Sequence, residues 1–275
     1  MGHWDSRSLP GRRSRREGVR IRGAVLLVSI LGVSRAVLAQ SSDVSEPPQP
    51  TASVAAAQGE LSPLLFAATV TSGRALVRGD AGYDSARPGG LLDSIAEVRI
   101  WGRLTLRAGA TYSDDTRRMR PSVGARIQLL RQSAHGVDGA LTSAFKTEGF
   151  DEAEGEIETT VALGRRIERS YLLLNLAYGQ DPEGKERDGE VRASWTHARR
   201  TVIFGLEARA RTAFGLQHGT YSALEPRADA VGGPIAMVPV GSFVLFGEVG
   251  PSTVKLAGRS FQWGVASLGG VGTTF

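Results

Sequence analysis

The sequence contains no cysteine, so neither a disulfide framework nor a lipid anchor on a cysteine is available to this chain. It also lacks an apolar run long enough to cross a bilayer as a helix. The run AVLLVSILGV, at 24–33, has about ten residues, whereas a spanning helix needs about 20. After residue 70 no segment shows the 3.6-residue apolar stripe of an amphipathic helix. These absences leave strands as the elements of the fold.

Positive charge is not in excess beyond residue 39, although the whole sequence has a net charge of +5. Residues 1–39 hold eight Arg and two acidic residues, which leaves 25 basic and 26 acidic residues in 40–275. A nucleic-acid partner requires a basic patch on the folded domain. The charge distribution therefore argues against nucleic-acid binding.

The first 39 residues have the three parts of a secretory signal peptide. A basic stretch, RRSRREGVRIRG, precedes the apolar run, and SRAVLA then places Val37 and Ala39 at the small positions of a cleavage site. This order predicts export and cleavage after Ala39. The paired arginines of SRREGVR leave a twin-arginine route as the alternative.

Residues 40–69 are rich in Ser, Pro, Gln and Ala without periodicity, which predicts a disordered periplasmic segment. The stretch LSPLLFAATV, at 61–70, either extends the first strand or packs separately. The remaining domain is expected to span 70–275.

Period-two alternation of apolar and polar residues runs through 70–275, as expected of half-buried strands. The pattern predicts an all-β fold, an antiparallel transmembrane β-barrel of about 12 strands, with ten to fourteen as the range. The predicted strands are 73–83, 94–101, 103–112, 121–131, 136–147, 154–164, 169–179, 188–198, 200–213, 227–239, 242–250 and 260–275.

The connections between these strands alternate between short turns and longer polar links. Barrels that cross the bacterial outer membrane have short periplasmic turns and long outer loops. An even number of strands then places both ends of the barrel on the short-turn side. The spacing therefore favours a membrane barrel over a soluble one.

One face of the predicted strands carries no charge, as a lipid-facing band requires. Its residues include Leu104, Leu106, Val123, Ile127, Val161, Leu172, Leu174, Leu176, Val191 and Leu206. Aromatic residues lie at the strand ends, with Tyr178 and Phe214 beside long links and Trp195 and Phe204 beside short turns. Rings at both ends are typical of the two girdles of a membrane protein. The apolar face is therefore predicted to meet lipid.

The last strand, FQWGVASLGGVGTTF, alternates uncharged residues and ends in Phe275. It resembles the closing strand of bacterial outer-membrane β-barrel proteins. The resemblance implies a location in the outer membrane of a Gram-negative bacterium, with outer-membrane lipid and the barrel-assembly machinery as partners. It also implies that Phe275 is an assembly signal.

The opposite face carries both signs of charge and is predicted to line the lumen. Two interpretations stand: cross-strand ion pairs that fill the interior, or a narrow water-filled pore, which inner Gly109, Gly124, Ala162, Ala177 and Gly205 leave room for. We expect a narrow porin-like channel for small solutes, the solute itself being unidentified; the alternative is an occluded structural or adhesive barrel acting through its outer loops. The residues predicted to line the lumen are Glu97, Arg99, Arg103, Arg107, Arg126, Glu156, Glu158, Glu190, Arg192, Glu207, Arg209 and Arg211.

No catalytic constellation is evident. The four histidines lack the His-x-Ser pattern of outer-membrane phospholipases, and His197 and Ser194, three apart on a strand, point to opposite faces. The acidic positions Asp181, Glu183, Glu186 and Asp188 have spacing suited to Ca²⁺, but Lys185 and Arg187 interrupt them. We therefore expect solvated loops, no metal, no cofactor and no enzymatic activity.

Overall fold

The computed structural model describes residues 57–62, 64–114, 117–147, 155–182, 187–214, 226–256 and 258–275. The predicted signal peptide and residues 40–56 lie outside these ranges. The described residues form twelve strands, and their bounds are β1 Ala75–Asp84, β2 Gly89–Trp101, β3 Leu104–Ser113, β4 Arg118–Leu130, β5 Asp138–Thr147, β6 Gly155–Ile167, β7 Ser170–Gln180, β8 Arg187–Arg199, β9 Val202–Phe214, β10 Pro226–Val240, β11 Phe243–Leu256 and β12 Phe261–Thr274.

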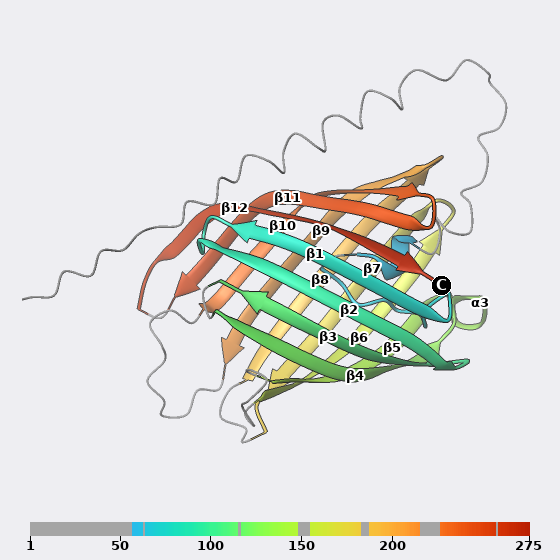
Figure 1. The fold of residues 1–275 in the computed structure, drawn as a ribbon, viewed down its shortest axis with the longest axis horizontal. Helices are drawn as coiled ribbons and strands as arrows, with labels where there is room; N and C mark the ends of the chain where they lie inside the picture. Colours follow the sequence, from blue (N-terminus) through green and yellow to red (C-terminus); the bar gives the residue numbers. More distant parts are fainter. Residues whose placement is uncertain are drawn as a thin grey trace, which may run out of the picture. The chain divides into compact units, whose positions relative to one another are not determined.

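The strands close into an antiparallel barrel in which each pairs with its neighbours in the sequence (Figure 1). Closure is made by β1 and β12, whose register runs from Leu76 opposite Thr274 to Asp84 opposite Ala266. Because closure removes both sheet edges, the strands of the barrel satisfy one another's backbone groups, as a bilayer demands. The predicted fold class is confirmed.

The barrel has two rims. The C-terminal rim holds Phe275 and the connections 102–103, 131–137, 168–169, 200–201 and 241–242, and the loop rim lies at the opposite end. The connection 131–137 contains one helical turn, α3 Gln132–His135, which ends at Gly136 with a left-handed φ of 77°. Among the described residues, no helix is long and apolar enough to cross a membrane.

Several strands are longer than the sequence pattern predicted. The second and fourth start within polar links, and β11 continues through Pro251, which lies opposite Val265 on β12. Pairing with a neighbouring strand continues these strands through polar residues and proline. The strict alternation of short and long connections is therefore lost, since 131–137 is longer than 85–88 or 114–117.

The outward face is apolar and solvent-exposed in the absence of lipid. Its large side chains include Leu106, Val123, Ile127, Leu129, Val161, Leu172, Leu174, Leu176, Val191, Leu206, Leu245 and Val265. Exposed aromatic rings lie near both rims, with Trp101, Trp195, Phe204 and Phe243 near the C-terminal rim and Tyr178, Phe214 and Trp263 near the loop rim. A soluble protein would bury this band, so the surface is that of a membrane barrel.

Candidate functional site

The charged residues predicted to line the lumen fall into two groups. Arg99 and Arg103 are exposed at the C-terminal rim. Arg103 lies in the turn between β2 and β3, because β3 begins only at Leu104, and neither side chain is enclosed. The other ten are buried or partly enclosed on the inner face: Glu97, Arg107, Arg126, Glu156, Glu158, Glu190, Arg192, Glu207, Arg209 and Arg211.

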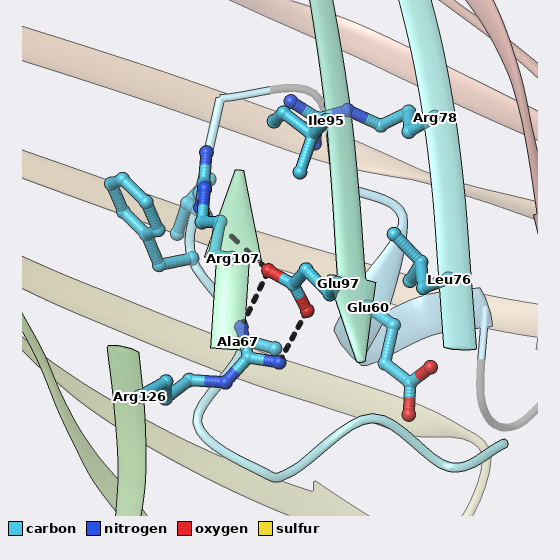
Figure 2. A pocket seen from close by; sticks show the side chains of 10 residues that line it. Glu60, Ala67, Leu76, Arg78, Ile95, Glu97, Arg107 and Arg126 are labelled. Atoms are coloured by element: carbon cyan, nitrogen blue, oxygen red, sulfur yellow. Dashed lines mark hydrogen bonds and ion pairs between the residues drawn. The ribbon is translucent and has the colours of Figure 1, made fainter. Parts of the chain in front are cut away.

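One ion-pair cluster joins β2, β3 and β4 in the interior. Arg126 donates to both carboxylate oxygens of Glu97, at 3.1 and 2.6 Å, and Arg107 Nη1 lies 3.8 Å from Glu97 Oε1. Figure 2 shows both arginines directed at this one carboxylate. Glu97 is 5% exposed and Arg126 2%. A carboxylate this deeply buried depends on its cations.

A second series of ion pairs continues around the wall from β5 to β10. Its members are Lys146 with Glu158 (2.5 Å), Arg192 with Glu190 (2.7 Å) and Glu158 (3.7 Å), Arg209 with Asp229 (2.6 Å) and Glu190 (3.4 Å), and Arg211 with Asp188. The interpretation of cross-strand ion pairs therefore describes much of the inner face.

Enclosure differs between the two halves of the lumen. Towards the loop rim, the side chains of Lys146, Arg209 and Arg211 are 37%, 35% and 41% exposed. Nearer the C-terminal rim, Glu97 and Arg126 are almost fully buried. Three cationic side chains of the loop-rim half are thus accessible to water, although the carboxylates paired with them are 7–13% exposed. The Glu97 and Arg126 cluster near the C-terminal rim is enclosed.

Part of this enclosure comes from the chain's own residues before β1. Residues 57–62 and 64–73, called the plug segment below, lie inside the barrel and appear in blue in Figure 1. Their buried side chains are Ala57, Gln58, Leu61, Ser62, Leu65, Phe66, Ala67, Ala68 and Thr71. The composition of 40–69 predicts a disordered segment, and 61–70 is expected either to extend the first strand or to pack separately. In the structure, 57–62 and 64–69 pack in the lumen, apart from β1.

Hydrogen bonds trace the plug segment from the C-terminal rim to mid-barrel and back. Gln58 Nε2 donates to the carbonyl oxygen of Arg169, in the turn between β6 and β7. Phe66 N donates to Oδ1 of Asn175, which lies in the middle of β7. The chain then returns, and Arg74 N donates to the terminal residue's carbonyl oxygen at 2.5 Å. Other contacts are Ser62 Oγ to Glu207 Oε1 (2.6 Å), Arg78 Nη1 to Ser62 O (2.7 Å) and Thr71 Oγ1 to Glu97 Oε2 (3.1 Å).

Small residues of the wall make room for the plug segment. A Cβ at Gly272 would lie 2.4 Å from Leu61 Cδ2, so a larger residue at this position would require the leucine side chain to shift. Ala162, one of the residues expected to leave space for a pore, instead packs in a cluster with Leu65, Ala68, Tyr171 and Leu173. A cavity of about 10 Å³ remains beside Glu97 and Arg107. It has room for about one water molecule and is too small for a larger solute.

The base of the plug segment is held by Glu60. Its carboxylate accepts hydrogen bonds from Ser72 N at 2.6 Å and Ser72 Oγ at 3.1 Å, so the two ends of the segment are joined. Figure 2 shows Glu60 lining the same small cavity as Glu97. Burial raises the pKa of Glu60 to about 7, against the opposing effects of the Ser72 hydrogen bonds and of Arg126.

Raising the pH through 7 is expected to loosen the plug segment. A pKa raised in the folded state means that stability is fully present below the ordinary pKa of the carboxyl group, about 4.5, and is lost as the pH rises through about 7. Limited proteolysis of the N-terminal segment should therefore be several-fold faster at pH 8 than at pH 5.5, after correction for protease activity. Glu60→Gln keeps an acceptor for Ser72 but does not titrate, so it should weaken this dependence. An unchanged pH dependence in Glu60→Gln would assign the effect to other groups.

One serine–histidine pair joins neighbouring strands. Ser170 Oγ lies 3.0 Å from His197 Nδ1, and these residues are opposite each other on β7 and β8. The sequence missed this pair because the partners are 27 positions apart. The His197 ring packs near Trp195 and Phe204. Among the described contacts no carboxylate orients this histidine, as a catalytic triad requires.

Two inner carboxylates have unsatisfied oxygens. Both oxygens of Glu248 and Oε2 of Glu207 are buried without a hydrogen-bond partner, on β11 and β9. Across the described ranges, no three His, Asp or Glu side chains gather in a way that would hold a metal ion. The two glutamates add buried carboxylate oxygens to the polar part of the lumen.

The comparisons with known proteins support the fold. No protein-family model matches the sequence, and no curated protein matches it. The NanC porin structure aligns with a TM-score of 0.52 at 10% identity, over 72% of this chain and all of that one. LpxR from Salmonella typhimurium aligns at 0.46 with 7% identity, over 73% of this chain and all of that chain. The translocator domain of autotransporter NalP from Neisseria meningitidis aligns at 0.39 with 15% identity, over 74% and 89%. The closed barrel of twelve strands and the alignment with the NanC porin structure together show the fold of a bacterial outer-membrane β-barrel.

Proposed function

We propose that the chain is an outer-membrane channel of porin-like build for small polar solutes, and that the plug segment closes its pore in the described conformation. The proposal includes export through a signal peptide cleaved after Ala39 and a Gram-negative outer membrane as the destination. The apolar outward band and the two aromatic girdles support that location.

The observation that carries the proposal is the difference between the two halves of the lumen. The loop-rim half is lined by partly exposed charges of both signs. The other half is filled by a segment that enters and leaves at one rim and is not part of the barrel wall. A segment so placed is able to withdraw without breaking any strand pairing. A channel with a removable plug follows from this arrangement.

The alternative is a permanently occluded barrel that acts through its outer loops. The apolar contacts of Leu61 and Leu65 inside the lumen favour it, because a plug with its own hydrophobic packing resists withdrawal. The two functions differ in what happens when the plug segment is removed.

Single-channel recording in planar bilayers tests the proposal. The mature chain is expected to be silent or to open rarely, whereas a variant lacking residues 57–72 should show discrete ohmic steps, since removal of the segment leaves a lumen lined by charged side chains that water and ions can enter. A variant lacking residues 40–56 keeps the plug segment and is the matched control. Heat-modifiable migration on gels verifies that each barrel has folded. A folded 57–72 deletion that remains silent would favour the occluded barrel.

Phe275 belongs to the same proposal as the signal read by the barrel-assembly machinery. It is 69% exposed at the C-terminal rim, and its backbone N–H donates to Ala75 O at 2.9 Å. The ring therefore stays accessible while the backbone completes the closing strand pair. An exposed terminal aromatic is well placed for recognition during insertion.

A further inference from the structure

The tip of the plug segment places one aromatic ring between two arginines of the lumen wall. The guanidinium carbon of Arg107, on β3, lies 4.3 Å from the centroid of the Phe66 ring. That of Arg192, on β8, lies 4.9 Å from the same centroid. Both distances are within the range of cation–π attraction, which requires the face of an aromatic ring. The ring is 6% exposed.

The backbone of Phe66 is held by a single side chain. Phe66 N donates to Asn175 Oδ1 at 2.6 Å, and Asn175 Nδ2 donates to Phe66 O at 3.1 Å. Asn175 is fully buried. Its amide thus satisfies both the N–H and the carbonyl oxygen of one residue, as a neighbouring strand would. The barrel wall therefore contacts an aromatic ring, through the two arginines, and the backbone N–H and carbonyl group of the same residue, through Asn175.

The arginines of this site are held in place by groups of the wall. Arg192 is paired with Glu190 and Glu158, and Arg107 with Glu97. These contacts do not involve Phe66, so they remain when the ring leaves. The carboxylates offset part of the arginines' charge, and both guanidinium groups lie over the ring at cation–π distance, which suits a neutral aromatic ligand.

We propose that this arrangement is a ligand site of the channel, occupied here by the chain's own Phe66, and that it takes short peptides or N-acylated amino acids with an aromatic side chain. The chemistry common to this class is an aromatic ring on a carbon flanked by an amide N–H and a carbonyl group. The inference rests on the proposed function, since a ligand reaches the site only when the plug segment withdraws.

Equilibrium binding to the detergent-folded full chain tests the site. The probe is the acetylated, amidated hexapeptide LLFAAT, which has the sequence of residues 64–69, and the control peptide carries leucine in place of phenylalanine. Phe66→Ala removes the internal competitor and should bind the LLFAAT probe on the order of tenfold more tightly than the unaltered chain does. The leucine peptide should bind more weakly by a similar factor, because it lacks the ring that Arg107 and Arg192 contact. Asn175→Ala added to Phe66→Ala should weaken the binding of both peptides, since both carry the backbone N–H and carbonyl group that this amide bonds.

The result that overturns the inference is a Phe66→Ala chain that binds both peptides equally, or no more tightly than the unaltered chain. Phe66→Leu, which conserves volume but lacks the ring, serves as the second variant if Phe66→Ala fails to fold, with the same expectation. Binding is measured without any current. If the folded variant lacking residues 57–72 is silent while the Phe66→Ala chain binds the probe, the channel is contradicted and the site is kept. If that deletion variant conducts while the Phe66→Ala chain does not prefer the probe, the site is contradicted and the channel is kept.

Discussion

Replacing Arg126 with alanine is expected to destabilise the barrel by about 3–5 kcal/mol, because removal of one partner leaves a buried charge without its counter-ion. Glu97 is 5% exposed and receives two hydrogen bonds from this arginine. Arg107 remains 3.8 Å away and compensates in part, so the lower end of the range is expected. Thr71 of the plug segment also loses a contact, since Arg126 Nη2 lies 3.3 Å from Thr71 Oγ1.

Urea unfolding in phospholipid vesicles at pH 7 measures this loss. Adding Glu97→Gln to Arg126→Ala should recover part of it, because the uncompensated charge is then absent. Arg103→Ala is the matched control, since Arg103 is exposed in a turn, and surface substitutions of this kind change stability by about 0.5 kcal/mol or less. Equal costs for Arg126→Ala and Arg103→Ala would show that the interior cluster does not stabilise the barrel.

The wall of the barrel could be predicted because its signal is local. Alternation along a single strand, as in Leu172, Leu174 and Leu176, states which residues share a face, and all three are exposed outward in the structure. Strand ends were predicted less well. Asp93 is polar but belongs to β2 because it pairs with Thr111 on β3. This pairing cannot be predicted from the sequence of β2 alone.

The plug segment could not be predicted because its partners are dispersed. Phe66 contacts Asn175, 109 positions away, and arginines on β3 and β8. The average composition of 40–69 predicts disorder. The apolar stretch that includes Leu61 and Phe66 shows neither helical nor strand periodicity, so its sequence does not predict which surface it packs against. Separate packing of 61–70 was one of two alternatives. The alternation of the last strand gives no sign that Gly272 on β12 contacts the side chain of Leu61 in the plug segment.

The central claim is that residues before β1 lie inside the barrel, and cysteine accessibility tests it. The chain has no cysteine of its own, so each single-cysteine variant reports one position. Ser62 is fully buried beside Glu207, and Ser→Cys changes little in volume. Ser260, near the loop rim, is exposed and supplies the matched reference.

The measurement is the rate at which a bulky, membrane-impermeant maleimide labels Ser62→Cys and Ser260→Cys in the barrel folded in vesicles open to the reagent on both sides. Labelling of a buried position requires local opening. Ser62→Cys is therefore predicted to react on the order of 100-fold more slowly than Ser260→Cys, and equally fast after unfolding. Equal rates in the folded barrel would place the segment outside the lumen and contradict the account.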